Sequence, residues 1–125
     1  ASRPDLVRAL VLCDTANVIG PKEMWQTRID AISKSGIEPI GDAVMERWFS
    51  PGFRTDRKAE LLGWRNMLVR TPAEGYVGVC AAIRDADMTE TTRQIDIPTM
   101  CVVGSDDGAT TSAGAVDGTA AASGA

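Results

Sequence analysis

Two short, almost continuously apolar runs lie near opposite ends of the chain. Residues 6–13 have the sequence LVRALVLC, and residues 97–104 have the sequence IPTMCVVG. Runs of this length and composition are typical of strands that are buried on both faces of a parallel sheet. A proline near the start of the second run and a glycine at its end mark its limits. The pattern therefore predicts two parallel strands joined by an unusually long connection.

Between these runs the apolar residues recur at three- and four-residue intervals, which is typical of amphipathic helices. Four helices are predicted, and turn residues at 35–36, 50–52 and 71–72 separate them. Their apolar faces consist of Trp25, Ile29 and Ile32; Ile40, Val44 and Trp48; Leu61, Trp64 and Leu68; and Tyr76, Cys80 and Ile83. The polar residues 89–92 follow the fourth helix and lead out of the helical region, either as a loop or as another short helix.

The pattern predicts an α/β fold in which two parallel strands flank an insertion of four helices. We expect a strand and turn over residues 1–16, the helical insertion over 17–94, and a strand with its following loop over 95–111. The final segment, 112–125, consists mainly of alanine, glycine and serine and has almost nothing to bury. It is predicted to be disordered.

Composition narrows the range of functions. The 125 residues, 44% of them hydrophobic and 24% charged, suit one globular domain or part of one. The net charge of −4 lacks the basic excess that nucleic-acid-binding domains show. This charge makes nucleic acid an unexpected partner. No apolar stretch approaches the roughly 18 residues of a membrane helix, so a membrane is not an expected partner either. Three cysteines, far apart in apolar surroundings, favour a reducing, cytoplasmic setting over a disulfide framework.

The chain contains no histidine. Imidazole is the commonest general base near neutral pH, so neither a Ser-His-Asp nor a Cys-His system can be complete within this chain. A G-x-S-x-G motif, which carries the nucleophile of many hydrolases, is also absent from the sequence.

Four segments of the sequence stand out: RPDLVRALVLCDTA at 3–16, ERWFSP at 46–51, MLVRTPAEGY at 67–76 and CAAIRDAD at 80–87. Together they resemble segments of the α/β-hydrolases, and in particular of the 3-oxoadipate enol-lactonases of aromatic-acid catabolism. The resemblance extends over roughly residues 1–111. It implies that the first strand follows the nucleophile strand, that the helices form a cap over the active site, and that the second strand delivers the acid of a catalytic triad.

The same resemblance assigns three site residues. Asp107 matches the catalytic carboxylate, which accepts a hydrogen bond from imidazole Nδ1–H and stabilises the imidazolium; its neighbour Asp106 is the rival for this role. Trp48 would pack its aromatic side chain against the lactone ring. Arg47 is a candidate contact for a substrate carboxylate, in a region, 22–70, with nine basic and seven acidic residues. The reaction would use serine as nucleophile and would need no cofactor and no metal.

Each assignment has a structural alternative. An aspartate after a strand is commonly a solvated turn residue, and tryptophans on apolar helix faces usually belong to the core. Too few carboxylates converge around Asp107 for a cation site.

Because the chain lacks both the G-x-S-x-G motif and a histidine, it is predicted to be inactive by itself. A non-catalytic helical module that self-associates through exposed strand edges, or the cap region of another α/β-hydrolase esterase, are the alternative functions.

Overall fold

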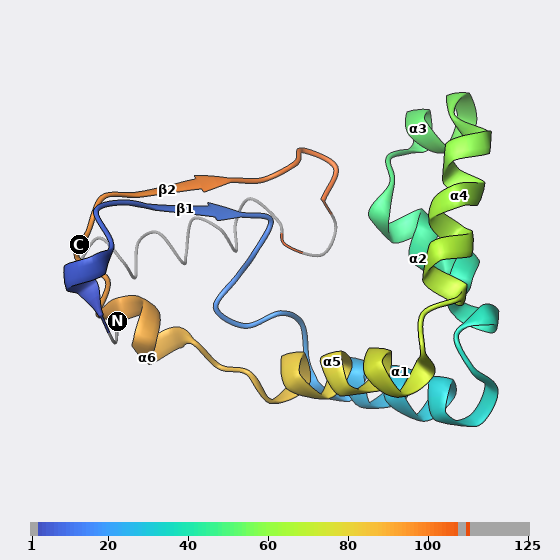
Figure 1. Ribbon diagram of the computed structural model, residues 1–125, viewed down its shortest axis with the longest axis horizontal. Coiled ribbons are helices and arrows are strands. Elements are labelled where there is room, and N and C mark those ends of the chain that lie inside the picture. The colour runs from blue at the N-terminus through green and yellow to red at the C-terminus, as the bar shows by residue number, and fades with distance from the viewer. Residues whose placement is uncertain (1–2, 108–109, 111–125) are drawn as a thin grey trace. The chain divides into compact units, whose positions relative to one another are not determined.

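The computed structural model describes residues 3–107 and 110 (Figure 1). The described residues divide into two compact units: one contains residues 3–19, 86–107 and 110, and the other is Gly20–Asp85. The helical unit is thus somewhat narrower than the predicted insertion 17–94. The predicted disordered tail, 112–125, lies outside the described residues.

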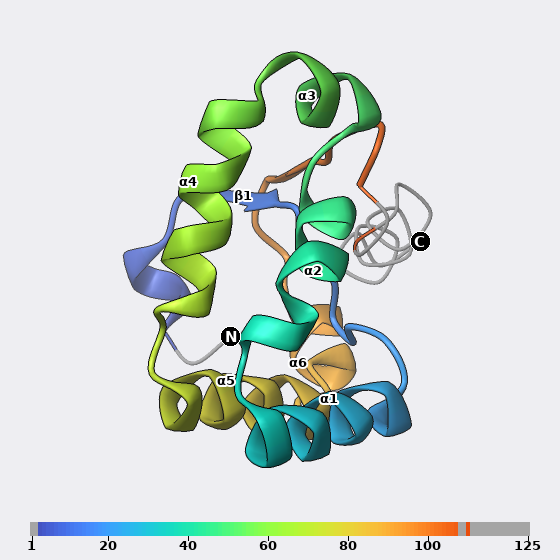
Figure 2. The same cartoon turned by 90° about the vertical axis from the view of Figure 1, so that its right-hand side faces the viewer.

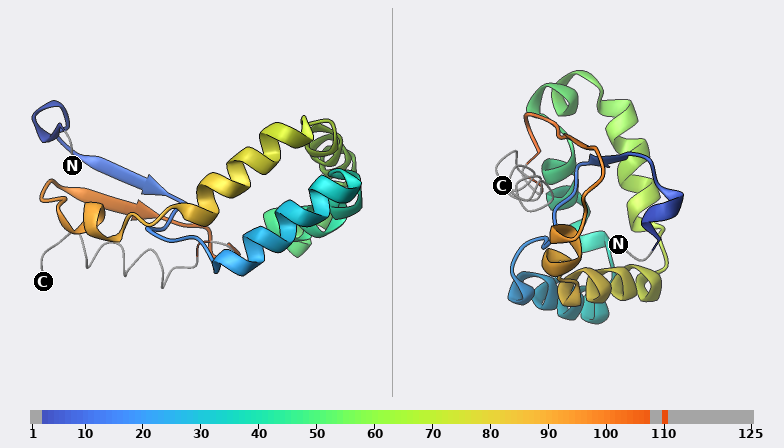
Figure 3. Two further views of the ribbon diagram at one scale, coloured as in Figure 1. Left: turned by 90° about the horizontal axis from the view of Figure 1, so that it is seen from below. Right: turned by 90° about the vertical axis from the view of Figure 1, so that its left-hand side faces the viewer.

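The strand unit contains the two predicted strands, and they are parallel. Val11 pairs with Met100 and Cys13 with Val102 in the register of the two strands. Figure 3 shows both strands running in the same direction. The elements of this unit are a 3-10 helix at Pro4–Leu6, β1 at Leu10–Cys13, α6 at Thr89–Arg93 and β2 at Thr99–Val102. The prediction of two parallel strands is confirmed.

Only one face of this pair is covered by the described residues. Leu12 and Cys101 are half-buried and, with residues of α6, enclose a cavity of about 210 Å³. On the other face Val11, Met100 and Val102 are 53%, 56% and 48% exposed. The expectation that both faces are buried is therefore wrong for the described part of the chain, because the single short helix α6 can cover only one of them.

Hydrogen bonds attach α6 to the turn that follows β1. The Met88 amide donates to the Asn17 carbonyl at 2.9 Å. Asn17 Nδ2 in turn donates to Thr89 Oγ1 at 3.1 Å. The polar exit segment of the insertion therefore forms a short helix at Thr89–Arg93 that is fixed to the strand unit.

The helical unit is built on two pairs of helices, with the short helix α3 against α4. Figure 2 shows α1 beside α5 and α2 beside α4. In Figure 1 the first pair runs across the page and the second runs up it, so this unit has the form of an L. The elements are α1 (Lys22–Ser35), a 3-10 helix (Glu38–Ile40), α2 (Gly41–Trp48), α3 (Pro51–Asp56), α4 (Lys58–Val69) and α5 (Ala73–Asp85). Its buried core is formed by Ile32, Ile37, Val44, Met45 and Leu68.

Helix α3 occupies a segment where the sequence predicted only a turn. Ser50 is the residue before the helix, and its Oγ accepts a hydrogen bond from the Phe53 amide at 3.3 Å. Pro51 occupies the first helical position, where its missing N–H has no cost. The Ser-Pro-Gly sequence at 50–52 thus ends one helix and also begins the next.

The predicted apolar faces are only partly buried. Trp25 is 8% exposed, as expected for a core residue, but Trp48 and Trp64 are 50% and 44% exposed. The core interpretation is therefore wrong for Trp64, and the exposure of Trp48 does not fit the core alternative to its predicted ligand contact. Each helix of a two-pair arrangement contacts one main neighbour, so its apolar stripe is wider than the surface that the neighbour covers.

Candidate active-site residues

The two strand ends are joined by Asp14, directly after β1. Its amide continues the ladder by donating to the Val102 carbonyl at 2.9 Å. Its Oδ1 accepts a hydrogen bond from the Gly104 amide at 3.1 Å. Asp14 has a φ of 45°, a left-handed conformation that aspartate tolerates better than most residues. This residue therefore fixes the point at which the loop after β2 begins.

Asp107 is held within a short turn at the end of that loop. Its amide donates to the Gly104 carbonyl at 3.1 Å. Its Oδ1 accepts from the Thr110 amide at 3.0 Å, and its Oδ2 accepts from the Thr110 hydroxyl. Thr110 is only 5% exposed. The carboxylate is consequently oriented by a buried partner.

These contacts distinguish Asp107 from its rival. Asp107 is half-buried and held through both carboxylate oxygens, whereas Asp106 is exposed. A carboxylate has about four lone-pair sites, so one carboxylate can in general accept from both a threonine and an imidazole N–H. The same bonds also fit a structural turn aspartate, so the geometry is compatible with both interpretations.

Trp48 and Arg47 lie at the end of α2 in the helical unit. Trp48 presents half of its side-chain surface to the exterior of the described residues. Arg47 is exposed, and its Nη1 lies 3.8 Å from Met24 Sδ. The three residues predicted from the sequence thus divide between the units: Asp107 belongs to the strand unit, and Arg47 and Trp48 belong to the helical unit.

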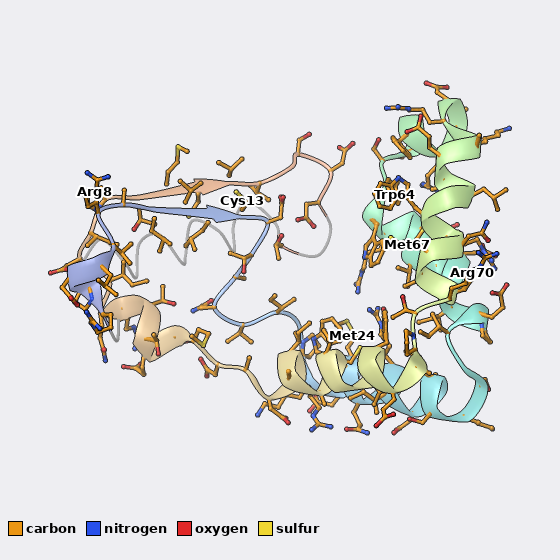
Figure 4. All side chains as sticks on the ribbon, in the orientation of Figure 1. Arg8, Cys13, Met24, Trp64, Met67 and Arg70 are labelled. Carbon is orange, nitrogen blue, oxygen red and sulfur yellow. The ribbon has the colours of Figure 1, made fainter. Side chains whose placement is uncertain are left out.

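The helical unit also carries apolar side chains that the sequence analysis did not single out as site residues. Figure 4 shows Met24, Trp64 and Met67 on the inner side of the L. Trp64 and Met67 are 44% and 52% exposed. Large apolar side chains gathered on one side of a helical unit are suited to contact an apolar ligand. Their helical spacing alone could not distinguish them from core residues.

Arg65 shows how the arginines of this unit are usually neutralised. Its Nε donates to Asp42 Oδ1 at 2.6 Å and its Nη2 to Glu38 Oε1 at 2.9 Å. These hydrogen bonds, Asp42 first, raise the pKa of Arg65 above its ordinary value. No such carboxylate partner is found for Arg47 within the described residues.

Two further properties bear on the class of function. Among the described residues, no helix is long and apolar enough to cross a membrane. No group of three or more histidine, cysteine, aspartate or glutamate residues in the described part of the chain could hold a metal ion.

The fold and sequence have clear relatives. No family model matches the chain. The curated 3-oxoadipate enol-lactonase 2 of Acinetobacter baylyi is 32% identical over 108 residues, which are 86% of this chain and 40% of that protein. The crystal structure of the enol-lactonase from Burkholderia xenovorans LB400 matches with a TM-score of 0.89 and 31% identity, over 97% of this chain and 46% of that one. A hydrolase from Pseudomonas aeruginosa PA01 matches with a TM-score of 0.85 and 27% identity, over 97% and 46%.

Two parallel strands with a helical insertion between them, together with these neighbours, define a partial α/β-hydrolase fold. Within that class, the chain resembles the 3-oxoadipate enol-lactonases, as the sequence words predicted. It spans about 40% of the length of the curated relatives that it matches.

Proposed function

We propose that this chain forms the cap and the acid-bearing strand of an enol-lactone hydrolase of the carboxylic-ester type. The observation that carries the proposal is its 32% identity to a curated 3-oxoadipate enol-lactonase, with a carboxylate held at the end of β2. In open parallel sheets, functional groups collect beyond the carboxyl ends of the strands. In this proposal residues 17–94 are the cap, and 1–16 and 95–111 belong to the catalytic core.

The proposed roles follow from side-chain chemistry. Asp107 would accept the Nδ1–H of an imidazole and stabilise its charged form while a serine attacks the lactone carbonyl. Backbone amides would hold the oxyanion, the departing enolate would become the ketone, and water would release 3-oxoadipate from the acyl-enzyme. Trp48 would contact the lactone ring, and Arg47 would contact the substrate carboxylate.

The setting proposed for this reaction is the cytoplasm, in the β-ketoadipate pathway of aromatic catabolism. The described cysteines support a reducing compartment: Cys13 is exposed, Cys101 is half-buried and Cys80 is buried, and no disulfide joins any two of them. The substrate would be a small lactone or ester that bears a carboxylate.

A chimera provides the test. The segment of the Acinetobacter baylyi enol-lactonase that aligns with residues 3–110 is replaced by those residues of this chain, and hydrolysis of the enol-lactone is measured. We expect turnover within roughly tenfold of the relative's own, because the serine and histidine come from the host sequence. A chimera with native circular dichroism but no turnover would contradict the proposal. The chain by itself is expected to show no turnover, since it has no histidine.

The exposed face of the strand pair supports a second candidate function, self-association. Val11 and Met100 lie opposite each other in the register and are more than half exposed. An apolar face and free strand edges favour association with another polypeptide.

We expect the chain to sediment as concentration-dependent oligomers. The double variant V11T/M100T should shift it towards monomer, because it removes apolar surface from the pair. The matched control is Leu62→Thr on α4, which is 57% exposed but lies in the helical unit, and it should leave the sedimentation coefficient unchanged. A wild-type chain that remains monomeric at all concentrations would exclude this candidate.

A further inference from the structure

A hollow of about 460 Å³ lies between α1 and α2 in the helical unit. Its volume falls in the range of about 300–1,000 Å³ that is common for small-molecule pockets. Apolar groups make up much of its wall, among them Met24 on α1 and Val44 on α2. Two arginines, Arg28 and Arg47, also line it, one from each helix.

Neither of these two arginines has an acidic partner among the described residues. Arg54, Arg57 and Arg65 form ion pairs with carboxylates, whereas Arg28 and Arg47 form none. None of the described residues that line the hollow is an aspartate or a glutamate. Guanidinium groups remain charged at all physiological pH values. The hollow therefore combines an apolar wall with two positive charges that lack a counter-ion from the helical unit.

The positions of both guanidinium groups are partly fixed. The Arg28 guanidinium carbon lies 5.1 Å from the centroid of the Trp25 ring, within the distance of a cation–π contact. Trp25 is itself 8% exposed and belongs to the buried part of α1. On α2, Arg47 Nη1 lies 3.8 Å from Sδ of Met24, which belongs to α1. Each guanidinium has five N–H donors, so these contacts leave donors available for a ligand.

We infer that this hollow binds the carboxylate of a small amphipathic acid, with Arg28 and Arg47 as its two cationic contacts. Carboxylates and guanidinium groups form charge-assisted hydrogen bonds, often in pairs. The apolar body of the acid would lie against Met24 and Val44. The choice of ligand, a carboxylate-bearing lactone or its dicarboxylate product, rests on the proposed function. The new element is Arg28, which becomes a second residue that recognises the carboxylate.

The test uses the full chain and adipate as the probe. In a two-dimensional ¹H–¹⁵N spectrum, the Nε–H signals of Arg28 and Arg47 should shift on titration with adipate and reach saturation. γ-Butyrolactone, which has the ring but no carboxylate, should shift neither signal. Arg28→Met and Arg47→Met should each weaken adipate binding on the order of tenfold or more. Arg28→Lys, which keeps the charge, should retain part of the affinity.

Arg70→Met is the matched control. Arg70 is an exposed arginine at the end of α4 (Figure 4). It has no ion pair among the described residues, and it is not one of the residues that line the hollow. Its loss should leave adipate affinity unchanged. Shifts that never saturate, that occur equally at Arg70, or that sodium chloride of the same ionic strength reproduces would overturn the inference. If Arg28→Met fails to fold, the comparison of Arg47→Met and Arg28→Lys with wild type decides it.

The outcomes also separate the two proposals. Saturable adipate binding with an inactive but folded chimera would leave the carboxylate site in place and remove the lactonase function. An active chimera whose parent chain shows no adipate shifts at either arginine would remove the carboxylate site and leave the lactonase function.

Discussion

Asparagine in place of Asp107 should lower kcat of the lactonase chimera by about 10³–10⁴-fold, on the scale that loss of a triad carboxylate shows in serine hydrolases. The amide cannot stabilise a developing imidazolium, and its NH₂ group favours the wrong imidazole tautomer. The fold should persist, because the amide oxygen can still accept from the Thr110 amide and the Thr110 hydroxyl can accept from the new NH₂ group. Steady-state kinetics on the enol-lactone, with KM measured separately, checks the result.

Asp106→Asn is the matched control for this prediction. It makes the same chemical change one residue earlier, at an exposed carboxylate. We expect kcat within about threefold of the parent chimera, as for a surface substitution away from the chemistry. A large loss at Asp106 combined with a small loss at Asp107 would reverse the assignment of the triad acid. Small losses at both would remove the acid role from this loop.

Ile32→Ala should destabilise the helical unit by about 2–5 kcal/mol, since it removes buried methyl and methylene groups and leaves a cavity. Ile32 is 1% exposed and belongs to the core cluster that joins α1 with α2 and α4. All three tryptophans of the chain, Trp25, Trp48 and Trp64, lie within Gly20–Asp85. Tryptophan fluorescence during urea denaturation therefore reports the unfolding of this unit alone.

Two variants calibrate that measurement. Ile32→Val removes a single methylene group and should cost about 0.5–1.5 kcal/mol. Val79→Ala removes a side chain on α5 that is 60% exposed, and it should change the free energy of unfolding by less than about 0.5 kcal/mol. Equal effects of Ile32→Ala and Val79→Ala would contradict the core described for this unit.

The regular elements were largely predictable because their signals are local. The two apolar runs correctly indicated parallel strands, and the i, i+4, i+7 spacing of Trp25, Ile29 and Ile32 indicated a buried helix face. The helix that begins at Pro51 was missed, because Ser-Pro-Gly is both a common turn sequence and a helix start. Trp64 was assigned to the core because spacing records which residues share a face, while burial depends on what packs against that face.

The candidate site was predictable only in part, because only some of its features are local in the sequence. The position of Asp107 beyond a strand followed from the sequence, but its hydrogen bonds to Thr110 depend on how the loop turns back. Arg28 and Arg47 are 19 positions apart in the sequence. Only the fold of the helical unit brings both to one hollow, so no local pattern could have paired them.

The hydrogen bond from the Gly104 amide to Asp14 joins two residues that are 90 positions apart in the sequence. It closes the entire helical insertion into a loop whose base is defined by the ends of β1 and β2. The entropic cost of such closure grows slowly, by about 0.6 kcal/mol for each doubling of loop length. The insertion can therefore change in length at little entropic cost, while the strand ends that precede the Asp107 loop stay as they are.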